Sequence, residues 1–291
     1  MPEAIADPLS EILRPQRRTA IVDIGANPID GDPPYKRMLA KGLCDVVGFE
    51  PQSDALARLD RNKGPHEYYL PYAVGDGSRQ TLRVCRSAGM TSLKVPDRAH
   101  LALFTLFPSL GEVTSEFPLS TRKLDDITEI SAMDWLKMDV QGSELDVLRS
   151  GRARLAEAVC VQTEVSFVPL YEGQPTFGEV DLFLRQAGFL PHRFAEVKVW
   201  PLAPTVINND PRKGLHQLLE ADAVYVRDFS HRDNLTSEQW KQLALVAHHA
   251  YGSVDLAARA VAMVVELGAA PSNAVQRYFE TLTRKQNEVR P

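Results

Sequence analysis

Two acidic residues lie near the ends of apolar segments in this 291-residue chain, Asp139 in 135–140 and Glu164 in 158–165. A carboxylate can remove the proton from an alcohol, which is a poor nucleophile until that proton is removed or shared. Two carboxylates can also share a divalent cation, because hard oxygen ligands suit magnesium or calcium. We therefore take Asp139 as the leading candidate base and Glu164 as the second, with both as candidate metal ligands.

The segment Val22–Tyr35, VDIGANPIDGDPPY, begins like the first strand and glycine turn of a nucleotide-binding sheet. A dinucleotide needs Gly-x-Gly-x-x-Gly running into a helix, whose N-terminal amides hold the pyrophosphate. Only Gly25 is present here, and Pro28 lacks an N–H and disfavours helix at the preceding residue. We predict that the helix begins later, with Asp32 as N-cap and Pro33 as its first residue. A P-loop is excluded because no Gly-Lys-Ser/Thr follows.

The ligand class that remains has no phosphates but still needs a close backbone approach at Gly25 and an acid for ribose hydroxyls. Glu50 ends the second apolar segment, 25 positions beyond Gly25, and suits the ribose. S-adenosylmethionine has this combination of parts. Asp30, Asp32 and Tyr35 then become candidates to touch its amino-acid end, although an N-cap is the alternative role of Asp32.

Short apolar runs alternate with helical patterns from Thr19 onward. Continuous Ile and Val runs are typical of parallel strands, so the alternation predicts an α/β fold with a Rossmann-like, doubly wound sheet. Between Thr81 and Leu124 the pattern weakens into β-hairpins and an irregular stretch. The expected strands are 20–25, 45–50, 67–74, 135–140, 158–165, 189–194 and 221–229, and the expected helices are 35–41, 53–61, 143–149 and 177–186.

Helix-forming residues dominate after Phe229. A capping box at 236–239 opens one helix, an apolar stripe that ends at Gly268 marks a second, and a third begins near Pro271. We predict an N-terminal extension at 1–18, a main domain at 19–230 and a C-terminal helical extension at 231–291. The extension is expected to pack on the main domain or on another subunit of a homo-oligomer.

The composition excludes several classes of protein. Hydrophobic residues make up 44% and charged residues 24% of the chain, and the net charge is −5, so no general basic surface for nucleic acid is expected. Three widely separated cysteines predict neither a disulfide framework nor a Cys-x-x-Cys metal site. Neither a secretory signal nor a membrane span is apparent, so we expect a cytoplasmic protein.

Six motifs occur in the order seen in the FkbM family of S-adenosylmethionine-dependent methyltransferases, which this chain resembles over about residues 19–229. They are 23–27, 48–51, 73–76, 91–93, 124–127 and 136–144. The resemblance implies the class I methyltransferase fold, a seven-stranded sheet whose last strand is antiparallel. It also implies O-methylation of a sugar or polyketide hydroxyl. The chain departs from the family by the loop 28–34 in place of a glycine, and by Gln141 in place of an acid.

The resemblance implies that several motif residues contact the cofactor. Gly25 and its neighbours would approach the methionine part, Glu50 the ribose, and Asp76 the adenine, although a turn role would also explain Asp76. The full set of expected cofactor contacts is Asp23, Gly25, Asn27, Glu50, Asp76 and Asp139.

Candidates for binding the methyl acceptor come from three other segments. Thr91 and Ser92 begin a stretch to Phe117 that is expected to cover the cleft, or to form a surface hairpin. His192 flanks the last strands and is expected near the acceptor, or on the surface. Glu144 is a further candidate, and its alternative role is to stabilise the first turn of its helix.

These observations favour an S-adenosylmethionine-dependent O-methyltransferase that acts on a sugar hydroxyl of a polysaccharide or glycoconjugate precursor. The sugar assignment depends on the family resemblance alone. The alternatives are methylation of a polyketide or other small metabolite, and a noncatalytic module that binds no cofactor. A dinucleotide oxidoreductase is a third hypothesis. A divalent metal is an open possibility.

Overall fold

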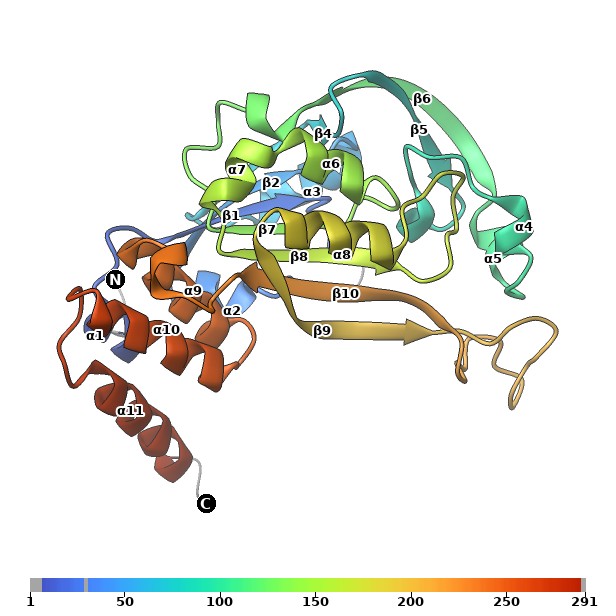
Figure 1. The fold of residues 1–291 in the computed structure, drawn as a ribbon. Coiled ribbons are helices and arrows are strands. Elements are labelled where there is room, and N and C mark those ends of the chain that lie inside the picture. Colours follow the sequence, from blue (N-terminus) through green and yellow to red (C-terminus); the bar gives the residue numbers. More distant parts are fainter. Residues whose placement is uncertain (1–6, 29–30, 289–291) are drawn as a thin grey trace.

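A seven-stranded sheet forms the centre of the protein, whose computed structural model describes residues 7–28 and 31–288 (Figure 1). The strand order is β3-β2-β1-β7-β8-β10-β9, and β10 runs antiparallel to both of its neighbours. This arrangement confirms the predicted α/β class and the antiparallel last strand. The strands are β1 Thr19–Ile24, β2 Cys44–Phe49, β3 Glu67–Leu70, β7 Trp135–Met138, β8 Cys160–Ser166, β9 Phe189–Val199 and β10 Leu218–Arg227.

A smaller three-stranded sheet lies beside the carboxyl ends of the central strands, in the order β4-β6-β5. Its strands are β4 Ala73–Val74, β5 Arg79–Cys85 and β6 Val113–Arg122. The single strand predicted at 67–74 is therefore wrong, because its last two residues leave the central sheet and pair with β6. The hairpin expected between Thr81 and Leu124 is present as the antiparallel pair of β5 and β6.

Helices cover both faces of the central sheet. One face packs against α6 Glu144–Ser150, α7 Arg152–Glu157 and α8 Phe177–Gln186 around Ile24, Leu136 and Val161. The opposite face packs against α9 Ser237–His249 and α10 Val254–Glu266, which lie on the other side of the sheet in Figure 1. The other helices that precede α6 are α1 Pro8–Leu13, α2 Lys36–Ala40, α3 Ser53–Asn62, α4 Arg98–Leu101 and α5 Phe107–Leu110.

The C-terminal helices share one hydrophobic core with the central sheet. Trp240 and Leu243 of α9 and Val261 of α10 are fully buried in the same cluster as Trp135 of β7. The capping box predicted at 236–239 is present, with Thr236 and Gln239 in reciprocal hydrogen bonds. The last helix, α11 Ala274–Glu288, packs against α1 and α10. The extension therefore packs on the main domain, which is one of the two arrangements that we expected.

Three local predictions are wrong. Helix α2 begins at Lys36 with Tyr35 as its N-cap, so Asp32 is not a cap and pairs with the Lys36 ammonium instead. No helix was predicted over 152–157, where α7 begins directly after Gly151. The last strand, predicted at 221–229, begins earlier, at Leu218, and ends at Arg227.

Gly25 is the point at which β1 comes closest to the residue that follows β7. Its φ is +77°, and a Cβ there would lie 2.0 Å from the backbone oxygen of Asp139. The Asp139 N–H donates to the Ile24 carbonyl at 3.0 Å, which holds the two segments together. Only glycine fits this position without moving backbone.

We expect Gly25→Ala to lower the free energy of unfolding by about 3 kcal/mol or more, because backbone must shift and the left-handed conformation disfavours a side chain. Urea denaturation followed by circular dichroism measures the change. Gly178→Ala is the matched control, since a Cβ at this position in α8 meets no atom within 4 Å. Equal stability of the two variants would contradict the close approach at Gly25.

Candidate active site

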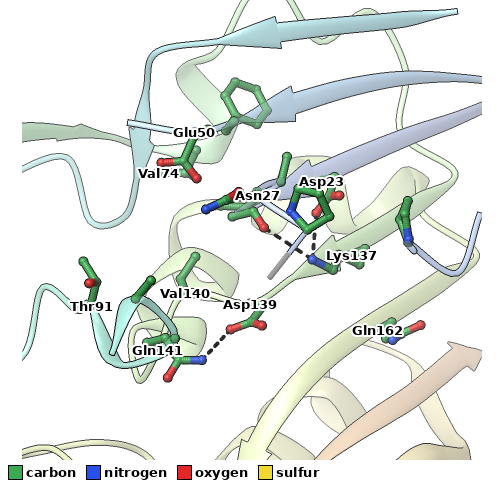
Figure 2. Close-up of a pocket in the computed structure, with 18 of the residues that line it drawn as sticks. Asp23, Asn27, Glu50, Val74, Thr91, Lys137, Asp139, Val140, Gln141 and Gln162 are labelled. Atoms are coloured by element: carbon green, nitrogen blue, oxygen red, sulfur yellow. Dashed lines mark hydrogen bonds and ion pairs between the residues drawn. The ribbon is translucent and has the colours of Figure 1, made fainter. Parts of the chain in front are cut away.

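A cavity of about 380 Å³ opens at the carboxyl ends of the parallel strands, between the turn after β1 and the smaller sheet (Figure 2). Its size falls in the range of small-molecule sites, and the position is where open α/β sheets bind ligands. Seven of the residues predicted to bind cofactor or acceptor line it, namely Asp23, Gly25, Asn27, Glu50, Thr91, Ser92 and Asp139. The structure thus brings together residues that lie more than 100 positions apart in the sequence.

Asp23 lies on the floor of this cavity and is held by two side chains. The Tyr35 hydroxyl donates to Asp23 Oδ2 at 2.5 Å, and the Lys137 ammonium lies 3.1 Å from Oδ1. Burial raises the pKa of Asp23, while Lys137 and Tyr35 favour the ionised carboxylate and oppose that rise. Tyr35 is itself fully buried against Trp135, so the expectation that it touches the ligand is wrong. Tyr35 instead holds the Asp23 carboxylate in place by its hydrogen bond.

The loop 28–34, which replaces the usual glycine, forms one side of the cavity. Its described residues Pro28, Gly31, Asp32, Pro33 and Pro34 all line the cavity. Because the next residue, Tyr35, is anchored on Asp23, the loop begins and ends beside the same carboxylate. Asp32 is therefore near the ligand space as predicted, whereas Asp30 lies outside the described residues.

Glu50 marks the opposite end of the cavity, next to apolar and aromatic side chains. It is 3% exposed, and its Oε1 accepts from the Gln52 N–H at 2.8 Å. Burial raises the pKa of Glu50, and the Gln52 hydrogen bond lowers it. Phe49 and Tyr72 stack at 6.3 Å between ring centroids, and Val74 completes this apolar wall. A purine ring beside a ribose would find both an apolar surface and a carboxylate here.

Asp139 projects into the cavity from the end of β7 and is hydrogen-bonded to Gln141 (Figure 2). Gln141 Nε2 donates to Asp139 Oδ1 at 2.7 Å and lies 3.4 Å from both carboxylate oxygens of Glu164. Among the described residues, the cavity walls include Asp139 and Gln141 but neither Glu164 nor Glu144. Glu164 therefore lies behind the Gln141 amide and does not line the cavity, so its role as the second candidate base stays a prediction.

Asp139, Glu144 and Glu164 nevertheless form one cluster, with a ligand atom from each within 4.8 Å of the others. Glu144 Oε1 accepts from the N–H groups of Val140 and Gly142 at 3.2 and 3.1 Å, so it stabilises the turn before α6. Burial raises the pKa of Glu144 to about 7. Burial and the nearby carboxylates of Glu220 and Asp139 raise the pKa of Glu164 well above its usual range. Both effects favour the protonated form of the Glu164 carboxyl.

Thr91 and Ser92 line the cavity as expected, but their hydroxyls already have partners. Ser92 Oγ donates to the Gln141 carbonyl at 2.5 Å, and Thr91 Oγ1 accepts from the Cys85 N–H at 3.3 Å. The segment 90–117 forms the short helices α4 and α5 and the first half of β6, not one continuous lid. Ser92 therefore ties this segment to the turn after β7, and Thr91 ties it to the end of β5.

Strands β8, β9 and β10 supply a polar wall that the motif reasoning missed. Gln162 Nε2 donates to Asp222 Oδ2 at 3.2 Å, and Lys198 pairs with Glu220 at 2.9 Å. All four side chains line the cavity together with Glu196. The polar residues that alternate with apolar ones in 218–227 were the available signal, because strand neighbours two apart share a face.

Two predicted ligand residues lie elsewhere. Asp76 is absent from the cavity walls among the described residues, and its Oδ1 accepts from Ser78 in its own turn. These contacts fit the turn role of Asp76, and its contact with adenine stays a prediction. His192 Nε2 is paired with Ser253 Oγ at 2.7 Å, where β9 meets the C-terminal helices. It joins two elements of the fold and is not part of the cavity.

Residues 23–191, more than half of the chain, match the family of the methyltransferase FkbM domain. The chain belongs to this family. A curated relative, the 2-O-methyltransferase NoeI of Sinorhizobium fredii, is 30% identical over 166 residues. That match covers 53% of this chain and 66% of the relative, so it spans just under two thirds of the relative's length.

Solved methyltransferase structures are also similar in outline to this FkbM domain. The precorrin-6y C5,15-methyltransferase of Geobacter metallireducens has 11% identity and a TM-score of 0.36, covering 78% of this chain and 93% of its own. A SAM-dependent methyltransferase of Aquifex aeolicus has 13% identity and a TM-score of 0.34, covering 76% and 90%. Both scores are low, so the fold assignment rests on the strand order and the family match. No helix in the described ranges is long and apolar enough to cross a membrane.

The cavity of this FkbM domain fits S-adenosylmethionine. At Gly25 the absence of a side chain lets a ligand come close to the backbone, and a Cβ there would collide with the backbone of Asp139. The buried Glu50 lies next to the apolar wall of Phe49, Tyr72 and Val74. In addition, Asp23 Oδ1 is buried without a hydrogen bond of good geometry, although the Lys137 ammonium lies beside it. The cavity thus offers an apolar wall for the adenine and the Glu50 carboxylate for the ribose. Its charged end, at Asp23 and Lys137, suits the amino-acid part.

We expect Glu144→Gln to flatten the pH dependence of stability. The folded protein binds the Glu144 proton more tightly than the unfolded chain does, because burial raises its pKa from 4.5 to about 7. Its contribution is therefore complete below about pH 4.5 and is lost as the pH rises through about 7, a change of about 3 kcal/mol. Glutamine keeps both backbone hydrogen bonds and removes the titration.

Urea denaturation at pH 4.5, 6 and 8 measures this loss, since Glu144→Gln should lose less stability over that range than the parent protein. The exposed Glu172→Gln is the control and should follow the parent at each pH. Parallel curves for Glu144→Gln and the parent would show that Glu144 titrates normally.

Proposed function

We propose that this protein is an S-adenosylmethionine-dependent O-methyltransferase that methylates a sugar hydroxyl of a polysaccharide or glycoconjugate precursor. The observation that carries the proposal is Asp139, a carboxylate that lines the cavity beside the Gly25 turn. The similarity to a 2-O-methyltransferase supports an oxygen acceptor. The polar wall of Gln162, Lys198 and Asp222 supports a hydroxylated one, because such side chains both donate and accept hydrogen bonds.

The bound cofactor supplies a methyl group made electrophilic by its sulfonium. The protein has to align the acceptor oxygen behind that carbon and to relieve the oxygen of its proton. Asp139 Oδ1 is occupied by the Gln141 amide, so the second carboxylate oxygen is the one available to accept the acceptor proton. Gln141 fixes the direction of this carboxylate, and Tyr171 in turn donates to Gln141 Oε1 at 3.2 Å. The base is thus held by neutral side chains.

A divalent cation at Asp139, Glu144 and Glu164 is the second arrangement that the cluster would allow. Hard oxygen ligands are present, but the Gln141 amide nitrogen faces both Asp139 and Glu164. Glu144 is also engaged by two backbone N–H groups. These donors satisfy the acids without a metal, so we propose base catalysis by Asp139 as the primary function. Turnover that depends on added Mg²⁺ would favour the metal instead.

We expect Asp139→Asn to reduce kcat by 100-fold or more, because an amide cannot accept the proton, while affinity for S-adenosylhomocysteine stays within about threefold. Stopped assays with radiolabelled S-adenosylmethionine measure kcat, and calorimetry measures affinity. Asp125→Asn, whose carboxylate caps the start of α7 away from the cavity, is the control for a carboxylate-to-amide change. Unchanged turnover in Asp139→Asn would refute the base.

We expect Glu50→Ala to weaken S-adenosylhomocysteine binding by at least 10-fold, since a buried carboxylate that receives ribose hydroxyls would be lost. Isothermal titration calorimetry provides the measurement. The control is Asp54→Ala, an exposed acid in the first turn of α3 that should bind as the parent does. No binding to the parent protein would favour a noncatalytic module, and NADH binding would favour an oxidoreductase.

The acceptor class is tested by mass spectrometry with a panel of oligosaccharides and polyketide alcohols and deuteromethyl-labelled cofactor. Label in a neutral or amino sugar supports the proposed acceptor. Label only in polyketide alcohols would replace it with the second class of acceptor that the family resemblance implies.

A further inference from the structure

Lys137 is a buried ammonium group that none of the motif roles above uses. It lies on β7 two residues before Asp139, so both side chains point to the same face of the sheet. Its side chain is 18% exposed, and that exposure is to the cavity, whose wall it forms (Figure 2). A charged lysine at the bottom of a ligand cavity is costly unless the charge is matched.

The known partners of Lys137 leave part of its hydrogen-bonding capacity for a ligand. Nζ lies 3.1 Å from Asp23 Oδ1 and donates to the Gly25 carbonyl at 3.4 Å. An ammonium has three N–H groups, so one remains for the cavity. Burial lowers the pKa of Lys137, but Asp23 and Asp139 outweigh it and raise the pKa above its usual value. The group is therefore charged at neutral pH.

The distribution of charged side chains around the cavity favours Lys137 as the residue that binds an anionic group of a ligand. Seven acids line the cavity in the described part of the chain, but only two cations do, Lys137 and Lys198. Lys198 comes from β9, where its ammonium pairs with Glu220. An anionic group of a ligand would be repelled along most of the wall, and Lys137 is the cation beside the Gly25 turn.

The two ends of the cavity fix which part of the cofactor reaches Lys137. The apolar wall of Tyr72 and Val74 lies at the Glu50 end and suits the adenine and ribose. The charged amino-acid part must then extend past Gly25 toward Asp23 and Lys137. We infer that Lys137 binds the carboxylate of the methionine part of S-adenosylmethionine, an assignment that rests on the function proposed above.

The experiment compares two ligands that differ only in this carboxylate, S-adenosylmethionine and its decarboxylated form. Calorimetry without acceptor measures binding to the parent and to Lys137→Met, so turnover does not enter. We expect the parent to prefer S-adenosylmethionine by 10-fold or more, because the decarboxylated ligand leaves the ammonium without an anion. Lys137→Met should bind both ligands with affinities within threefold of each other.

Two further variants separate ligand binding from support of the fold. Lys137→Met leaves Asp23 as an unpaired buried acid, so Lys137→Met/Asp23→Asn removes both charges while Tyr35 keeps an acceptor. It should also lack the preference for the carboxylate. Lys94→Met is the matched control, since Lys94 is 20% exposed, pairs with Asp146 and lies outside the cavity walls among the described residues. It should keep the preference of the parent.

The outcomes distinguish this inference from the proposed function. If the parent binds neither ligand, the cofactor assignment itself fails. If the parent binds both and the double variant still prefers S-adenosylmethionine by 10-fold, the carboxylate lies elsewhere and Lys137 only balances the charge of Asp23. Equal affinity of the parent for the two ligands would overturn the inference in the same way.

Discussion

The close packing of β1 against the end of β7 sets the position of the side chains at the centre of the cavity. No Cβ fits at Gly25, because it would lie 2.0 Å from the Asp139 carbonyl oxygen, and the Asp139 N–H bonds to Ile24 directly beside it. The Gly25 turn and the Asp139 carboxylate are thus joined through backbone. In the function that we propose, a small shift of either segment would move the base away from the methyl group.

Buried polar contacts hold both segments that meet at Gly25, the turn after β1 and the turn after β7. On one side, Asp23 is fixed by Tyr35 and Lys137, and the loop between Gly25 and Tyr35 is anchored at both ends. On the other side, Gln141 holds Asp139 with a neutral amide. An acid at position 141 would add a further negative charge beside Asp139 and Glu164, where burial already penalises charge. The glutamine is therefore compatible with a working base.

The C-terminal helices contribute to the cavity although they follow the region that matches the family. Tyr251, in the turn after α9, packs against Trp135 and donates to Gln162 Oε1 at 2.8 Å. Gln162 in turn donates to Asp222 on the polar wall. Removal of these helices would expose a large apolar face and also release that wall, so they are part of the same folding unit as the sheet.

The sequence by itself determined the alternating fold and the residues at the ends of parallel strands, such as Gly25, Glu50 and Asp139. This was possible because hydrophobic periodicity defines strands, and the strand ends of an open sheet face one edge. Only the tertiary structure decided that Tyr35 turns inward and that Lys137 meets Asp23. Such contacts depend on the packing of distant segments in three dimensions, which local sequence patterns do not specify.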